Sequence, residues 1–340
     1  MSVEIKPMTA KDLITDQEVR WCPGCGDYSI LKQVQTVIPE LGLKRENIVF
    51  ISGIGCSSRF PYYMETYGMH SIHGRATAIA SGLKSVRNDL SVWIVTGDGD
   101  SMSIGGNHFI HLLRRNFDVN ILLFNNEIYG LTKGQYSPTS KEGLITKSSP
   151  YGVIDHAFNP AALCLGAEAT FVARSMDRDP VQLREILKRA HQHKGSSVLE
   201  IYQNCNVFND GAFEIYTEKA SKKLNTLFVN QGQPLLFGEN NSKGIMLVGF
   251  TPTIVDMEKV SVNDLWIHDE KDRVKAGILA RMFDNPTNEG AMPRPFGVFY
   301  AEERPCYEDL MNQQIADVTV KRGKGNLDDI LKGNSVWEIN

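Results

Sequence analysis

The sequence predicts an α/β fold with a doubly wound, mainly parallel sheet. Three observations lead to this prediction: the apolar runs are continuous rather than alternating, they recur at wide spacing, and helical patterns lie between them. Continuous runs suit strands that are buried on both faces, and an alternation of strands and helices gives a parallel sheet. The runs that predict strands cover residues 47–53, 91–97, 119–126, 168–174 and 196–202.

Helical patterns fill the intervals between these runs. The segment 179–195 carries the clearest signals, because Asp179 suits the N-cap, Pro180 fits the first turn and Gly195 provides a stop. Similar helical patterns cover residues 26–42 and 104–116. The chain therefore alternates strand and helix as far as about residue 205.

The pattern changes at about residue 206. From there the apolar pieces are short and are separated by glycine, proline and asparagine, and we find no internal repeat. A length of 340 residues allows one large domain or two of ordinary size. We therefore expect residues 1–205 to form the domain that carries the functional site, and residues 206–340 to form a C-terminal extension packed on it.

Composition and charge narrow the classes of function. With 42% hydrophobic and 22% charged residues, the chain reads as an ordinary globular protein. Neither its N-terminus nor any internal segment shows the apolar run of a signal peptide or a membrane span, so we expect a cytoplasmic protein that does not enter a membrane. A formal net charge of −4 and scattered cationic residues argue against binding to nucleic acid.

A Gly-Asp-Gly turn follows the second predicted strand at residues 97–99. Its glycines let the backbone approach a ligand closely, and the helix after it offers N–H groups to a phosphate. An ordinary strand-to-helix turn is the plain alternative. The ligand site is favoured because Asp98, Asn126 and the carbonyl of Ile128 are oxygen ligands suited to Mg²⁺ beside a diphosphate. This two-part spacing resembles the thiamine diphosphate motif.

Four of the six cysteines converge on the same edge of the predicted sheet. Cys56 and Cys205 each follow a strand, and Cys22 and Cys25 precede the helix that leads down to the first strand. A cytosolic chain of this size does not suggest a disulfide framework, so the four thiolates would hold zinc or a 4Fe-4S cluster. We favour the cluster, because zinc cannot accept electrons from the electron-rich product of a thiamine-dependent decarboxylation.

Several motifs together carry a resemblance to a known family. The segments "WCPGCGDYSIL", "SGIGCSSR", "HGRATAIASGLK", "GDGDSMSIGGNH" and "NNEIYGLTKGQYSPTS" resemble the β subunit of 2-oxoacid:ferredoxin oxidoreductases, most like the 2-oxoglutarate type, over about residues 15–210. The resemblance implies a domain of the thiamine diphosphate-binding (pyrophosphate) type with Mg²⁺ and a 4Fe-4S cluster. It places the cluster on Cys22, Cys25, Cys56 and Cys205, and the metal ion on Asp98, Asn126 and Ile128.

The family reaction is the oxidative decarboxylation of a 2-oxo acid with coenzyme A, which gives an acyl-CoA and reduces ferredoxin. The resemblance implies that this chain acts on 2-oxoglutarate to form succinyl-CoA, or works in the reductive direction as some members do. We find no duplicate of the cofactor domain to carry the glutamate that activates thiamine, and in the family this residue belongs to an α subunit. We therefore expect a chain that is inactive alone and joins an α subunit in an (αβ)₂ assembly.

Loops at the same edge supply the predicted contacts with substrate and cofactor. Arg59 and Lys133 are the preferred contacts for substrate carboxylates, and His73 is a candidate to move protons or position the substrate carbonyl. Arg75 is a structural alternative to these cations. The predicted cofactor-binding residues are Gly55, Cys56, Ser57, Ser58, His73, Gly97, Asp98, Gly99, Asp100, Asn126, Ile128, Gly130, Leu131 and Thr132.

Other ionisable residues are assigned to packing rather than to the site. His108 and His111 stand three apart on a predicted helix without further ligands, so we interpret them as packing residues. Cys164 lies in an apolar helical pattern, and Cys306 has no cysteine nearby in the sequence. Neither cysteine belongs to the predicted site.

Other functions remain open at this point. The same chemistry could act on pyruvate or branched-chain 2-oxo acids, because part of the substrate pocket should come from the partner. A non-oxidative thiamine decarboxylase would use the cysteines only for structure, and a non-catalytic scaffold would bind zinc with them. Iron analysis and anaerobic absorption separate these alternatives, since a colourless protein with zinc and no iron would exclude the cluster.

Overall fold

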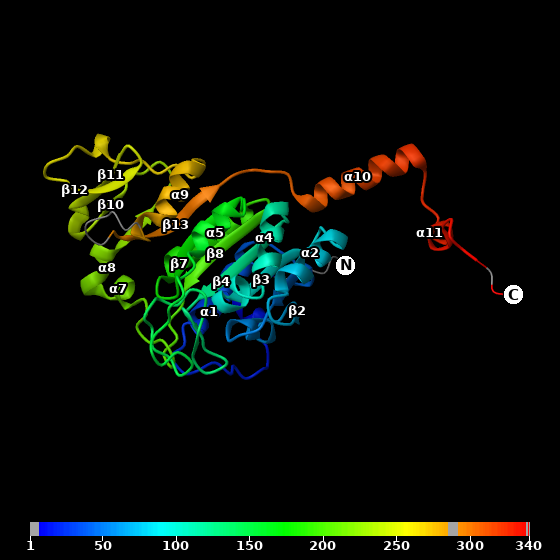
Figure 1. The fold of residues 1–340 in the computed structure, drawn as a ribbon, viewed down its shortest axis with the longest axis horizontal. Helices are drawn as coiled ribbons and strands as arrows, with labels where there is room; N and C mark the ends of the chain where they lie inside the picture. Colours follow the sequence, from blue (N-terminus) through cyan, green and yellow to red (C-terminus); the bar gives the residue numbers. More distant parts are fainter. Residues whose placement is uncertain (1–6, 285–291, 338, 340) are drawn as a thin grey trace.

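The computed structural model describes residues 7–284, 292–337 and 339. Its centre is a sheet with the strand order β2-β1-β3-β4-β8-β7-β13-β9, and helices cover both faces (Figure 1). The six neighbouring strands β2, β1, β3, β4, β8 and β7 pair in parallel. The predicted α/β fold is therefore confirmed. The strands are β1 (Ile48–Ser52), β2 (Tyr67–His70), β3 (Ser91–Gly97), β4 (Val119–Asn125), β7 (Phe171–Met176), β8 (Ser196–Tyr202), β9 (Thr226–Val229) and β13 (Arg294–Ala301).

Each predicted strand has a counterpart in this sheet. The strands β3 and β8 occupy the predicted ranges, 91–97 and 196–202. The segment 168–174 begins later than expected, at Phe171, because Glu168 takes a left-handed conformation with φ of 66° and cannot continue an extended strand. The edge strand β2 was not predicted, since its sequence Tyr-Gly-Met-His is short and largely exposed.

Alternate residues of the central strands pack against opposite helical layers. In β3, Trp93 and Val95 face the layer formed by α1 and α6, whereas Val92 and Ile94 face the layer of α2, α4, α5 and α9. Continuous apolar runs are needed because both faces are buried. The helices of these layers are α1 (Asp27–Glu40), α2 (Ala76–Val86), α4 (Gly106–Arg115), α5 (Pro160–Gly166), α6 (Pro180–Gln192) and α9 (Arg273–Arg281), and the short α3 (Asp98–Met102) follows β3.

The helix α6 begins as its sequence predicts. The side chain of Asp179 accepts a hydrogen bond from the backbone N–H of Gln182, and Pro180 occupies the first turn. The helix ends at Gln192, and Gly195 follows it with φ of 136°. This left-handed glycine turns the chain into β8.

Residues after 205 complete the sheet and add a small lobe. The strand β13 lies between β7 and β9, antiparallel to β7 and parallel to β9. The lobe contains an antiparallel sheet of β10 (Leu236–Phe237), β11 (Lys243–Val248) and β12 (Thr251–Asp256), and α7 (Glu214–Thr217) and α8 (Lys219–Asn225) precede it. The segment 206–340 is thus joined to the first 205 residues through a shared sheet.

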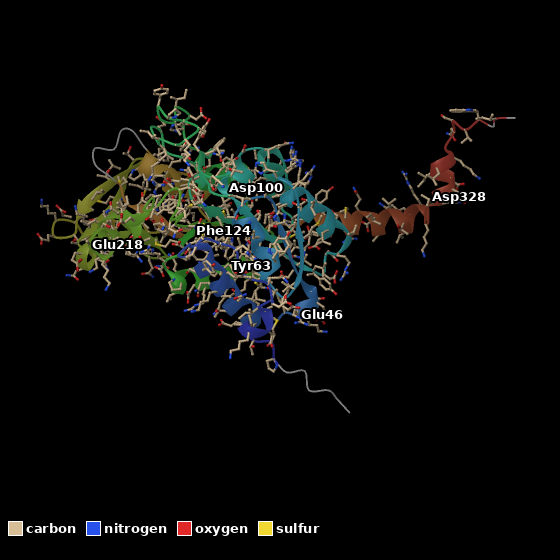
Figure 2. The ribbon with its side chains drawn as sticks, turned by 90° about the horizontal axis from the view of Figure 1, so that it is seen from below. Glu46, Tyr63, Asp100, Phe124, Glu218 and Asp328 are labelled. Atoms are coloured by element: carbon tan, nitrogen blue, oxygen red, sulfur yellow. The ribbon has the colours of Figure 1, made fainter. Side chains whose placement is uncertain are left out.

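The last two helices form an arm that extends from the body. They are α10 (Tyr307–Arg322) and α11 (Leu327–Lys332), and Figure 1 shows them running away from the sheet. In the side-chain view Phe124 and Tyr63 lie within the body, whereas Asp328 lies far out on the arm (Figure 2). Among the described residues, no helix combines the length and the apolar character needed to cross a bilayer.

The stability of this fold is expected to fall as the pH falls from about 7 to about 4, partly through His193. Burial lowers the pKa of His193 from its ordinary 6.5 to about 4, and its Nε2 lies 2.8 Å from the hydroxyl of Thr170. The unfolded chain therefore binds a proton in this window that the folded chain does not, and stability present above pH 6.5 is lost as the pH drops. The contribution is at most about 3 kcal/mol, reduced by solvent screening.

Denaturant titrations at pH 7 and pH 5 test this expectation. His193→Gln should flatten the pH dependence, whereas His111→Gln, on an exposed position of α4, should leave it unchanged. If the free energy of unfolding depends on pH equally in wild type and His193→Gln, groups other than His193 cause the acid sensitivity.

Candidate functional site

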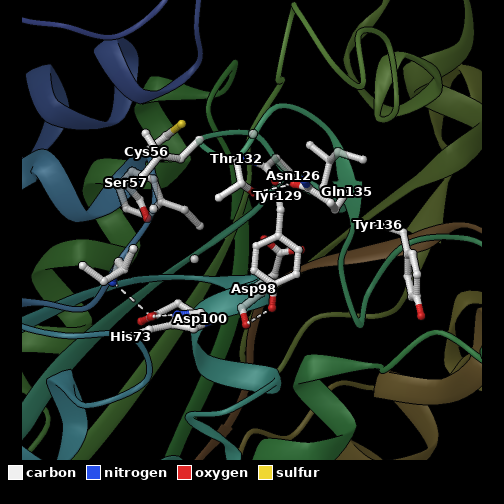
Figure 3. Close-up of a pocket in the computed structure, with 18 residues that line it drawn as sticks. Cys56, Ser57, His73, Asp98, Asp100, Asn126, Tyr129, Thr132, Gln135 and Tyr136 are labelled. Carbon is white, nitrogen blue, oxygen red and sulfur yellow. Dashed lines mark hydrogen bonds and ion pairs between the residues drawn. The ribbon is translucent and has the colours of Figure 1, made fainter. Parts of the chain in front are cut away.

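A pocket of about 450 Å³ lies at the carboxyl ends of β1, β3 and β4 (Figure 3). Ligands commonly bind at this edge of a parallel sheet, because the strand ends and their loops meet there. The predicted cofactor residues that line it are Gly55, Cys56, Ser57, His73, Gly97, Asp98, Gly99, Asp100, Asn126, Ile128, Gly130, Leu131 and Thr132. It is also lined by residues that were not predicted, which are Ile54, Phe124, Tyr129, Gln135 and Tyr136.

Asp98 stands at the start of α3, directly after β3, and is buried in the pocket wall. Its Oδ2 accepts hydrogen bonds from the hydroxyls of Ser137, at 2.6 Å, and Thr139. Burial raises the pKa of the Asp98 carboxyl, and the two hydroxyls act in the opposite direction. Both hydroxyls bind the same oxygen, and backbone N–H groups of Asp98 and Gly99 also hydrogen bond to the carboxylate. A metal ion would favour the charged form that burial disfavours.

Asn126 follows β4 and lines the same pocket. Its Oδ1 accepts a hydrogen bond from the backbone N–H of Ile128 at 3.1 Å, which folds the side chain back over the turn. Its Nδ2 donates to Oε1 of Gln203 at 2.8 Å. Amide and carboxylate oxygens therefore stand on neighbouring strand ends, which is the ligand chemistry that Mg²⁺ prefers. The residues present fit the predicted metal ion.

Two glycines shape the pocket wall, and at Gly99 no other residue fits without a shift of its neighbour. A Cβ atom at Gly99 would lie 2.4 Å from the ring of Tyr129, whose hydroxyl donates to the carbonyl of Gly99 at 2.7 Å. A Cβ atom at Gly97 would meet the hydroxyl oxygen of Ser57 at 3.5 Å and little else. At both positions the wall is bare backbone, which allows a bulky anionic ligand to approach the N-terminus of α3.

Asp100 ties three loops of the pocket together. Its Oδ1 accepts from the backbone N–H groups of Ile54 at 3.0 Å and Gly74 at 2.7 Å, and it lies 2.7 Å from Nδ1 of His73. Its Oδ2 accepts from the hydroxyl of Thr96 at 2.8 Å. Because these partners occupy both oxygens, Asp100 organises the loops around the pocket. Its bond to Nδ1 of His73 leaves Nε2 as the ring nitrogen that can act on a ligand.

The four predicted cysteines are neighbours beside the pocket. A Cβ atom built on Gly130 would lie 3.5 Å from the sulfurs of both Cys56 and Cys205. Burial raises the pKa of the Cys56 thiol to about 12, and the charges of Asp27 and of the Cys205 and Cys22 thiols raise it further. Burial is also the main cause that raises the pKa of Cys25. A positively charged metal centre is what would stabilise thiolates in these surroundings.

Among the described residues, no group of three or more histidine, cysteine, aspartate or glutamate side chains is placed to hold a single metal ion. The choice of an iron–sulfur cluster over zinc therefore rests on redox chemistry, because zinc does not change its oxidation state.

Asp27 is a neighbour of the cysteines that was not predicted. It is fully buried at the start of α1, and no nitrogen or oxygen donor of the described residues hydrogen bonds to either carboxylate oxygen. Burial raises its pKa to about 7, the charge of Asp177 raises it further, and the thiol of Cys25 partly opposes the shift. A carboxyl group directly after "CPGCG" at the start of an apolar helix was the available signal.

Three predicted residues lie outside the pocket as the structure describes it. Arg59 reaches toward the carbonyl of Arg20 at 3.4 Å. Lys133 is exposed at the turn between β5 (Ile128–Tyr129) and β6 (Gln135–Tyr136), where it takes φ of 75°. Ser58 is buried in the 3-10 segment 57–63, and its carbonyl accepts from the hydroxyl of Ser52. Their contacts with substrate or cofactor stay predictions.

The remaining candidates have structural surroundings. Arg75 donates hydrogen bonds to the carbonyls of Gly74 and Ile104 and so connects two loops. These contacts agree with the structural role that the sequence analysis gave it as an alternative. His108 is half-buried on α4, but His111 is exposed, so its assignment to packing was wrong. The residue faces solvent because the buried stripe of α4 runs through Phe109, Leu112 and Leu113. Cys164 and Cys306 are each 1% exposed and lie away from the pocket lining.

Comparison with known proteins gives three findings. A family model described as thiamine pyrophosphate enzyme, C-terminal TPP binding domain, matches residues 53–201. Over 338 residues the chain is 50% identical to the 2-oxoglutarate oxidoreductase subunit KorB of Mycobacterium tuberculosis, covering 98% of this chain and 89% of the relative. Over 243 residues it is 38% identical to the 2-oxoglutarate synthase subunit KorB of Methanocaldococcus jannaschii, covering 70% of this chain and 88% of that protein.

A solved structure is similar over almost the whole chain. It is the 2-oxoglutarate:ferredoxin oxidoreductase from Magnetococcus marinus with 2-oxoglutarate, coenzyme A and succinyl-CoA bound. The TM-score is 0.75 at 31% sequence identity, and the match covers 96% of each chain. The likeness therefore extends through the small lobe as well as the sheet.

Proposed function

This chain belongs to the β subunits of 2-oxoacid:ferredoxin oxidoreductases, of the 2-oxoglutarate type, and we propose that with an α subunit it converts 2-oxoglutarate and coenzyme A into succinyl-CoA and CO₂. Ferredoxin takes the electrons, and the reductive direction is the same chemistry reversed. One observation carries the proposal: the oxygen ligands Asp98 and Asn126 line a pocket that Cys56 and Gly130 share with the cysteine group.

We propose that Asp98, Asn126 and the carbonyl of Ile128 would hold Mg²⁺, which would offset the negative charge of a bound diphosphate. Thiamine diphosphate supplies, when bound, the carbon nucleophile for decarboxylation of the 2-oxo acid. The chain's own part is to orient the oxygens: Ser137 holds Oδ2 of Asp98, and Ile128 holds Oδ1 of Asn126. Tyr129 packs against Gly99 and keeps the turn in place.

Cys22, Cys25, Cys56 and Cys205 are the proposed ligands of a 4Fe-4S cluster. A bound cluster would supply one-electron chemistry between the pocket and ferredoxin. Cys56 lines the pocket, and its sulfur and that of Cys205 would each lie 3.5 Å from a Cβ atom built on Gly130. Because Gly130 has no side chain, the pocket and the cysteines adjoin at this residue.

His73 is the proposed group for proton movement in the pocket. Asp100 fixes the ring through Nδ1, so Nε2 is the atom that accepts or returns a proton. Arg59 and Lys133 remain the proposed partners of the substrate carboxylates, reached through movement of the loops or contact with the α subunit. We propose that the α subunit also supplies the glutamate that activates thiamine, in an (αβ)₂ assembly. A cytoplasmic location stays a prediction, which the six free thiols support.

Reconstitution with and without the α subunit tests the proposed function. The purified β chain should release no CO₂ from 2-oxoglutarate, and the complex should reduce ferredoxin only when coenzyme A is present. Activity with 2-oxoglutarate should exceed that with pyruvate and branched-chain 2-oxo acids by about tenfold or more, since recognition of a second carboxylate adds charge-assisted hydrogen bonds. A clear preference for pyruvate would overturn the substrate, and CO₂ release without ferredoxin reduction would favour the non-oxidative decarboxylase.

A further inference from the structure

The side chain of Gln203 connects the two proposed metal-binding groups. Gln203 follows β8, is 1% exposed, and donates its backbone N–H to the carbonyl of Asn125 at 2.9 Å. Its Oε1 accepts from Nδ2 of Asn126 at 2.8 Å. Its Nε2 donates to the carbonyl of Asn204 at 2.5 Å and to the sulfur of Cys25 at 3.2 Å. One carboxamide thus bonds to a ligand from each group.

Neighbouring backbone groups fix the direction of this carboxamide from both ends. The N–H of Ile128 donates to Oδ1 of Asn126, so the atom of Asn126 that faces Gln203 is Nδ2. Because Nδ2 is a donor, the atom of Gln203 that faces it must be the acceptor Oε1. At the other end the carbonyl of Asn204 can only accept, so it requires Nε2. The two requirements agree. The group that faces the sulfur of Cys25 is therefore a donor.

We propose that Gln203 is a positioning residue for the reaction, which raises the reduction potential of the cluster and holds Asn126 toward the metal ion. The inference rests on the proposed function. An N–H donor stabilises negative charge on a ligand sulfur, and the reduced cluster carries more of that charge than the oxidised one. Water cannot replace the donor, because Gln203 is buried.

The contact with Asn126 serves the second part of the proposal. A hydrogen bond on Nδ2 keeps Oδ1 on the opposite side of the amide, at the turn that carries the carbonyl of Ile128. Residues that orient metal ligands typically contribute 10–100-fold to metal affinity. The cluster and the thiamine site would then depend on one shared side chain.

Two substitutions separate these roles in the αβ complex. Gln203→Leu removes both contacts, whereas Gln203→Glu keeps an acceptor for Asn126, removes the donor to Cys25 and adds negative charge. Gln35→Leu is the matched control, since Gln35 is also buried and donates to the carbonyls of Leu13 and Tyr63. A redox titration followed by electron paramagnetic resonance gives the reduction potential, and calorimetry gives the affinity for Mg²⁺ and thiamine diphosphate.

The ratio of reduced to oxidised cluster at a fixed ambient potential should fall about tenfold in Gln203→Leu, which is ~59 mV for a one-electron couple, and at least as much in Gln203→Glu, whose carboxylate adds negative charge. Affinity for Mg²⁺ with thiamine diphosphate should fall about 10–100-fold in Gln203→Leu but stay within about threefold in Gln203→Glu. Gln35→Leu should change neither quantity.

If the Gln203 variants load iron but keep the wild-type reduction potential, the inference about Gln203 is overturned and the proposed function is not affected. Wild-type complex without iron would overturn the proposed function together with it. If Gln203→Leu fails to fold, a wild-type potential in Gln203→Glu would still refute the first part. Retained affinity in a folded Gln203→Leu would refute the second part.

Discussion

Cys205→Ser is expected to remove the iron from the chain, whereas Cys164→Ser leaves the iron content unchanged. The sulfur of Cys205 lies beside that of Cys56 at the pocket edge, and a proposed cage with three thiolates is incomplete. Cys164 lies in α5, is 1% exposed, and packs in the apolar core between the sheet and the layer of α2, α4, α5 and α9. Iron and sulfide analysis of anaerobically purified complex should give about four irons per β chain in wild type and Cys164→Ser, and about one or fewer in Cys205→Ser.

The comparison needs a control for folding, because Cys164→Ser buries a hydroxyl group in an apolar helix. Cys164→Ala removes that complication, and thermal unfolding of each variant reports stability separately from iron content. Absorption in the visible range should follow the iron analysis. Equal iron in Cys205→Ser and Cys164→Ser would mean that the proposed set of ligands is wrong.

Asp98→Asn is expected to abolish binding of Mg²⁺ with thiamine diphosphate without destabilising the apo chain. Loss of a direct metal ligand should exceed the 10–100-fold that supporting residues contribute, so we expect a fall of more than about 100-fold. Because burial raises the pKa of Asp98, its ionised carboxylate is less favourable in the folded apo protein than in the unfolded chain. The neutral amide removes that charge and still presents one oxygen to Ser137.

Calorimetric titration measures the affinity for Mg²⁺ with thiamine diphosphate. Thermal unfolding of the same samples measures the stability of the apo chain. Asp155→Asn is the matched control, because Asp155 is exposed and accepts a hydrogen bond from Tyr136 at the pocket margin. It should bind the cofactor like wild type. Wild-type affinity in Asp98→Asn would place the metal ion elsewhere, and a large loss of stability would indicate a structural role for the carboxylate.

The features that the sequence predicted best depend on chain geometry alone. Once the continuous apolar runs are recognised as parallel strands, their carboxyl ends must share an edge, and Cys56, Asp98 and Asn126 must meet there. The helix cap at Asp179 followed from local chemistry. None of these predictions required knowledge of distant contacts.

The features that the sequence did not predict depend on contacts between distant segments. The strand β13 pairs antiparallel with β7, which no local pattern announces. The bond between Gln203 and Cys25 joins residues 178 positions apart, so neither residue signals the other. The contacts of Arg59 and Lys133 with substrate stay predictions, because loop conformation determines where long side chains reach. His111 was misread because three-residue spacing does not tell which face of a helix is buried.

The place of β13 in the sheet has a consequence for biosynthesis. Among the strands that the structure describes, β13 is the last in chain order, yet it lies between β7 and β9. A nascent chain on the ribosome therefore carries all its proposed cofactor residues while β7 still has an open edge, the kind of edge that pairs with other chains. Translation has to proceed to Ala301 before that edge closes. Chaperones and the proteins that deliver iron would therefore meet the pocket before β13 completes the sheet.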